Sequence, residues 1–181
     1  MLRYAWSRLS GRSVPNPNPP RQTATPIVSR VASTPQISPS HRSRVLAMQL
    51  SHSRLCGPRR ADRLSRLGIT TLGDLLYGDL RSIAANFGAP QKAAEQLGRY
   101  RRAIRLAAAV PNLSPADALV LVTIHRRNPQ SLIRESAGTL HRDLIRFSNS
   151  TLGRSTLRGR PVPSLRRIKR WIAGANATVA V

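Results

Sequence analysis

Acidic residues are scarce in this chain of 181 residues, which has seven Asp and Glu against 30 Lys and Arg and a formal net charge of +23. Its single cysteine, Cys56, excludes an internal disulfide and a cysteine-rich zinc site. The longest apolar run, residues 116–124, is interrupted by Asp117 and Thr123. That run is far shorter than the roughly 20 residues of a membrane-spanning helix. We therefore expect no membrane association, and a polyanion as the partner of this basic chain.

The few acids lie together in the middle of the sequence. None occurs before Asp62 or after Asp143, whereas residues 1–61 hold ten Arg and residues 144–181 hold eight Lys and Arg. Only two of the 30 bases are Lys. Because Arg suits bidentate phosphate contact, this distribution favours a phosphate-containing partner.

Residues 1–45 are predicted to be a disordered basic tail. The segment 10–44 is rich in Pro, Ser, Arg and Thr, and such a composition cannot bury enough apolar surface to offset its ordering entropy. An acid-free, Arg- and Ser-rich leader also fits a mitochondrial transit peptide, which stays open as an alternative.

The rest of the chain has the texture of short helices and predicts an all-α fold. A first unit is expected over residues 46–110, with a helix that stops at Gly68, a second capped by Thr70 or Thr71, a third capped by Asp79, and a fourth after Pro90. At 40% hydrophobic residues and 4% aromatics, the chain can bury a core, but not one that spans its whole length. Phe87, Tyr100 and Trp171 are expected inside it, rather than on a platform that stacks single-stranded bases.

A second, divergent unit is predicted over residues 111–147. Its Pro115-x-x-Ala-x-x-Leu start, capped by Ser114, repeats the start of the first unit at Pro58 with an offset of 57 residues. The copy lacks a glycine where Gly68 ends the first helix. We interpret the pattern as an internal duplication.

Residues 148–181 are expected to form a loop and a basic C-terminal helix. Leu165, Ile168, Trp171 and Ile172 make an apolar stripe from Ser164 to Ile172, and the opposite face is basic.

Three turns place a small residue and a proline directly before a helix, at Gly57-Pro58, Gly88-Ala89-Pro90 and Ser114-Pro115. The first backbone N–H groups of a helix lack partners and lie at the positive end of its dipole, so such a turn can hold a phosphate. In the first two turns, Arg59, Arg60 and Lys92 would add charge-assisted contacts.

Residues 50–105 resemble the C-terminal domain of the bacterial RNA polymerase alpha subunit, a helix-hairpin-helix fold. The resemblance is carried by Leu67-Gly68-Ile69-Thr70-Thr71-Leu72-Gly73-Asp74-Leu75-Leu76 and by Asp79-Leu80 through Asn86-Phe87-Gly88-Ala89. It implies that Arg59 and the backbone hairpin at residues 86–88 enter the DNA minor groove. Asp62 stands where that family has a DNA-contacting asparagine, and Pro90 where it has a hairpin lysine. The duplicated arrangement is also similar to a bacterial family of uncharacterised tandem helix-hairpin-helix proteins.

These observations predict tandem helix-hairpin-helix units, SAM-like or similar to the polymerase alpha C-terminal domain, that bind nucleic acid without catalysis. Duplex DNA is favoured, and phosphate contact supplies most of the affinity. The scattered acids and the histidines at 41, 52, 125 and 141 show no catalytic or metal-ligand spacing, so no catalytic residue, metal or cofactor is expected. The candidate binding residues are Gly57, Arg59, Arg60, Arg63, Asn86, Gly88, Lys92, Arg99, Arg166, Arg167, Lys169 and Arg170.

Two other functions remain open at this point. The helical hairpins could form a protein-binding adaptor or scaffold, or the chain could be an organellar ribosome-associated basic protein. The expected location is the cytoplasm, on the nucleoid, or the mitochondrial matrix for a eukaryotic source.

Overall fold

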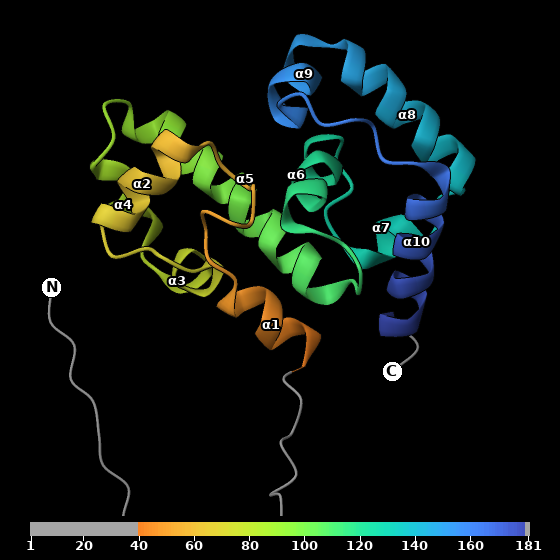
Figure 1. Ribbon diagram of the computed structural model, residues 1–181, viewed down its shortest axis with the longest axis horizontal. Coiled ribbons are helices and arrows are strands. Elements are labelled where there is room, and N and C mark those ends of the chain that lie inside the picture. Colours follow the sequence, from red (N-terminus) through yellow and green to blue (C-terminus); the bar gives the residue numbers. More distant parts are fainter. Residues whose placement is uncertain (1–39, 180–181) are drawn as a thin grey trace, which may run out of the picture. The chain divides into compact units, whose positions relative to one another are not determined.

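The computed structural model describes residues 40–179, and within them the chain is all-α, as predicted (Figure 1). Residues 1–39, which hold most of the predicted tail, and residues 180–181 lie outside the described residues. The described part contains ten helices and one isolated β-bridge, between Gln49 and Thr71. The helices are α1 (His41–Ala47), α2 (Pro58–Arg66), α3 (Leu72–Tyr77), α4 (Leu80–Ala85), α5 (Pro90–Ala109), α6 (Pro115–Thr123), α7 (Pro129–Ile133), α8 (Ala137–Asn149), α9 (Thr151–Leu157) and α10 (Leu165–Val179).

The helix boundaries repeat along the chain with the offset seen in the sequence. Helices α2, α3 and α4 start 57 residues before α6, α7 and α8, respectively. The caps recur as well, because the Thr71 side chain accepts a hydrogen bond at the start of α3 and Asn128 does so at the start of α7. Asp79 and Ser136 form the third such pair, before α4 and α8. The local signals that start each helix are therefore duplicated with the apolar pattern.

In the turn after α6, another residue takes the left-handed conformation that Gly68 has in the first copy. Gly68 ends the turn after α2 at φ +80°, and His125, 57 residues later, takes the same left-handed conformation at φ +66°. The following N–H groups make equivalent 6→1 hydrogen bonds, from Ile69 to the Leu64 carbonyl (3.0 Å) and from Arg126 to the Leu121 carbonyl (2.9 Å). A histidine accepts this conformation more readily than a β-branched residue would.

Helix α5 lies at the centre of the packing. It contacts α1, α3, α4 and α6, and Leu97, Tyr100 and Ile104 on it are fully buried. Helix α10 covers α7 and α8, with Ile168 and Trp171 in the same core. The expectation that Tyr100 and Trp171 are internal is confirmed.

Phe87 meets that expectation only in part, because it packs against the core but is half-buried at the turn after α4. The Arg63 guanidinium lies over its ring, 4.7 Å from the centroid. One face of the ring therefore meets a cation instead of the core.

Three segment boundaries differ from prediction because tertiary contacts order short, weakly patterned stretches. Residues 41–45, predicted as tail, belong to α1, where Val45 is buried. Part of the predicted loop forms α9, capped by the Ser150 side chain. The last helix continues to Val179, seven residues beyond the predicted end at Ile172. In this added part, the Thr178 hydroxyl donates a hydrogen bond to the Ala109 carbonyl (2.8 Å).

Candidate nucleic-acid interface

Positive charge in the described part of the chain is mostly unneutralised. Residues 40–179 hold all seven acids and 25 of the 30 bases. Within this range, carboxylates pair with Arg126, Arg160 and Arg167. The other arginines, Lys92 and Lys169 leave a positive surface potential that attracts anions.

One group of these cations lies along α2. Arg59, Arg63 and Arg66 lie one helical turn apart and line a shallow groove of about 580 Å³ together with Asn86 and Leu67. We call this surface the α2–α4 groove. Asp62 is its one acidic lining residue. Of the predicted site residues, the structure therefore brings Arg59, Arg63 and Asn86 together.

Arg63 is held in place, because its guanidinium donates to the Asn86 carbonyl and lies over Phe87. Arg59 and Arg66 are exposed and make no ion pair among the described residues. A fixed central cation flanked by two exposed ones can contact successive phosphates of a nucleic-acid backbone.

Two other predicted residues, Arg60 and Arg99, lie away from this groove. Arg60 donates to the Tyr100 hydroxyl (3.0 Å). Both arginines line a separate cleft with Arg158, between α5, α6 and α9. The 100° step between neighbouring helical residues turns Arg60 to a different side of α2 from Arg59.

The three predicted phosphate-binding turns have different surroundings. Gly88 has open space around it, and Lys92 nearby is exposed. Gly57 lies beside Arg158, whose Nη1 would be 3.7 Å from a Cβ at that position. The third turn corrects the prediction, because the buried carboxylate of Asp117 already occupies the start of α6, where Ser114 also caps the helix.

The basic C-terminal helix supplies exposed cations on one side and a structural contact on the other. Arg166, Lys169 and Arg170 are exposed. Arg167 instead pairs with Asp117 and lies over the Trp171 ring, 5.8 Å from the centroid. Arg167 is also exposed, but its guanidinium pairs with a buried carboxylate, so less of its charge is available to a phosphate than that of its neighbours.

Asp117, at the beginning of α6, forms ion pairs with two arginines, one just before α10 and one in its first turn. It is 2% exposed, and its second partner is Arg160, whose Nη1 lies 3.1 Å from Oδ1. Arg160 also donates to the Ala116 and Leu157 carbonyls. The charge of Arg160 is thus committed to the fold.

Sequence reasoning missed Arg54, Arg66 and Arg158. The spacing of Arg66 from Arg59 and Arg63 along α2 was a usable signal. Nothing local marks Arg54 or Arg158, because their position depends on how α9 packs against the first unit.

Burial raises the pKa of the Cys56 thiol, and the nearby Arg158 and Arg60 guanidinium groups only partly offset this. The thiol is thus a small, buried and weakly acidic group. Across residues 40–179, no group of three or more His, Cys, Asp or Glu side chains could hold a metal. No helix in the same range has the length and apolar character needed to cross a membrane.

Comparison with known families gives one match. Residues 54–178 match the model of a family described as a domain of unknown function, DUF4332. No curated protein and no solved structure matches the chain.

Proposed function

The chain belongs to the DUF4332 family, and we propose that it binds duplex DNA without catalysis, mainly through phosphate contacts in the α2–α4 groove. The observation that carries the proposal is the row of Arg59, Arg63 and Arg66 with Asn86 beside it. Three cations one turn apart on an exposed helix suit successive anionic groups of a polymer.

The composition of this surface favours affinity over sequence choice. Phosphate contacts fix the position of a protein on the duplex but carry no sequence information directly. Arg166, Lys169 and Arg170 on α10 are exposed and can add electrostatic attraction. A groove lined by three arginines favours a polyanion over the apolar helix that an adaptor would bind. Binding to chromosomal DNA would place the protein on the nucleoid.

The test is a titration of the full chain with fluorescent duplex DNA across a salt series, with Arg59→Gln/Arg66→Gln beside the wild type. Arg63 is left in place because it contacts Asn86 and Phe87. We expect the double variant to bind about 10–100-fold more weakly near 0.1 M salt. The slope of log affinity against log salt should fall in magnitude by about 2.

The matched control is Arg142→Gln/Arg146→Gln on α8, which removes two exposed arginines and the same charge. We expect less than about a threefold loss, because screening weakens charges that touch no phosphate. Equal losses in the two double variants would reject the groove and leave only general electrostatic attraction.

A second prediction concerns a substitution that should increase the affinity for duplex DNA. Asp62 is exposed and lines the groove, so its carboxylate repels phosphate. Asp62→Asn is expected to strengthen duplex binding about 3–10-fold without changing the melting temperature by more than about 2 °C. Glu95→Gln on α5, also exposed, removes the same charge elsewhere. An effect no larger than that of Glu95→Gln would show that Asp62 does not face the bound DNA.

A further inference from the structure

A second cationic pocket lies on the neighbouring side of α2, and Asp62 lines both it and the groove. It has a volume of about 370 Å³. Its charged lining residues are Arg54, Asp62, Arg158 and Arg160, and Cys56 and Pro58 at the start of α2 also line it. We call it the α2–α9 pocket.

Two of these arginines are uncommitted. The guanidinium groups of Arg54 and Arg158 take no part in the side-chain hydrogen bonds or ion pairs of residues 40–179, whereas that of Arg160 binds Asp117. Both uncommitted residues are in the left-handed region, at φ +54° and φ +52°. For Arg158 this is the left-handed conformation of a residue that ends a helix.

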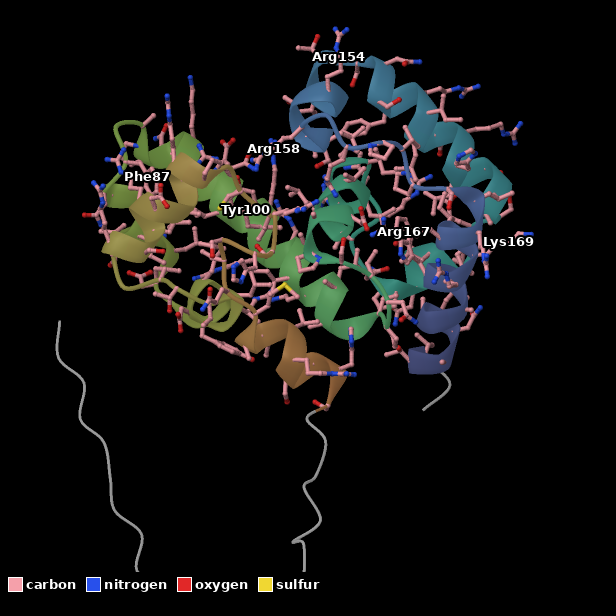
Figure 2. The ribbon with its side chains drawn as sticks, viewed as in Figure 1. Phe87, Tyr100, Arg154, Arg158, Arg167 and Lys169 are labelled. Carbon is pink, nitrogen blue, oxygen red and sulfur yellow. The ribbon has the colours of Figure 1, made fainter. Side chains whose placement is uncertain are left out.

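Arg158 directly follows α9, a short helix that does not start 57 residues after any helix of the first unit. The helices of the two copies correspond from α2 to α4 and from α6 to α8, and α9 follows as a short extra helix before α10. Figure 2 shows Arg158 on the side of α9 that faces α2 and α5, whereas Arg154 projects outward from the same helix. Helix α9 thus delivers a cation to the turn at Gly57, 3.7 Å from where a Cβ would lie.

We propose that the α2–α9 pocket binds a phosphomonoester, the terminal phosphate of a nucleic-acid strand; this inference rests on the proposed function. A terminal phosphate carries close to two negative charges at neutral pH, which two free guanidinium groups can match. The pocket is large enough for an end group and too small for a duplex to enter. Asp62 at the pocket is a single opposing charge against these arginines.

The experiment measures binding of the full chain to three versions of one fluorescent duplex, with a 5′-phosphate, a 3′-phosphate, or hydroxyl groups at all ends. The variant is Arg158→Asn, because asparagine tolerates the left-handed conformation and removes the charge. The control is Arg154→Gln, an exposed arginine four residues away on α9. Melting temperatures of all forms establish that they are folded.

We expect the wild type and Arg154→Gln to bind one of the phosphorylated ends about tenfold more tightly than the hydroxyl duplex. Arg158→Asn should reduce that preference to less than about threefold, and its affinity for the hydroxyl duplex should match that of Arg154→Gln. No preference in the wild type, or a preference that Arg158→Asn retains, overturns the inference.

Inorganic phosphate separates this inference from the proposed function. At constant ionic strength, phosphate should raise the melting temperature of the wild type and Arg154→Gln more than that of Arg158→Asn. If no duplex binds but this difference is found, the proposed function fails and the pocket is a site for free phosphate. If duplex binds through the groove without any end preference, the proposed function stands and the terminal-phosphate site is rejected.

Discussion

Replacing Asp117 by alanine is expected to lower the free energy of unfolding by about 2–3 kcal/mol, because it removes a buried carboxylate that two arginines and a helix cap contact. Asp117 is 2% exposed and pairs with both Arg160 and Arg167. Its carboxylate also accepts from the Ser114 hydroxyl (2.6 Å) at the start of α6. One substitution therefore disturbs a helix start and two long-range ion pairs.

Urea unfolding at neutral pH, followed by circular dichroism, measures this effect. Asp143→Ala is the matched control, because Asp143 also pairs with an arginine, Arg126 (3.1 Å), but its side chain is 34% exposed. We expect that variant to lose about 1 kcal/mol or less. Similar losses in the two variants would mean that burial of the Asp117 pairs contributes little.

Gly153→Ala is expected to cost about 3 kcal/mol or more, because the new methyl group meets backbone and not a movable side chain. A Cβ at this position would overlap the carbonyl oxygen of Phe147 and lie 2.5 Å from its carbonyl carbon. Gly153 stands in the first turn of α9, directly after the end of α8. Relief of the overlap requires α9 to move, and Arg158 would move with it.

The same unfolding measurement checks this prediction, with Gly98→Ala as its control. Gly98 lies inside α5 and has no atom within 4 Å of an added Cβ. We expect this variant to be more stable than the wild type by about 0.5–1 kcal/mol, since alanine loses less backbone entropy in a helix. A Gly153→Ala variant as stable as the wild type would show that α8 and α9 adjust without cost.

Local chemistry in the sequence was sufficient to place most helices. Thr70 or Thr71, Asp79 and Ser114 were predicted as caps. The structure selects Thr71, and Thr71, Asp79 and Ser114 each accept a backbone hydrogen bond at the start of their helices. Gly68 was predicted as a terminator and is left-handed. Capping and turn conformation depend on a few neighbouring residues, so they can be read without knowledge of the fold. The weakly patterned α1 and α9 were missed because their order comes from packing.

The groove was only partly predictable. Arg59, Arg63 and Asn86 were all among the predicted binding residues, and they line one surface. Arg60 and Arg167 were expected beside phosphate, but one contacts the Tyr100 hydroxyl and the other a buried carboxylate. The sequence identifies a basic residue and its helical face, but it does not identify what lies opposite that face.

The all-α class, most of the helix starts, the 57-residue repeat and the excess of positive charge follow from the sequence alone. All of these depend on composition or on contacts within a few residues. The tertiary structure alone decided which arginines are free. Arg167 reaches Asp117 across 50 positions of sequence, and Arg158 reaches the turn at Gly57. Ion pairing and desolvation depend on distance in space, so the division between structural and available cations exists only after the helices have packed.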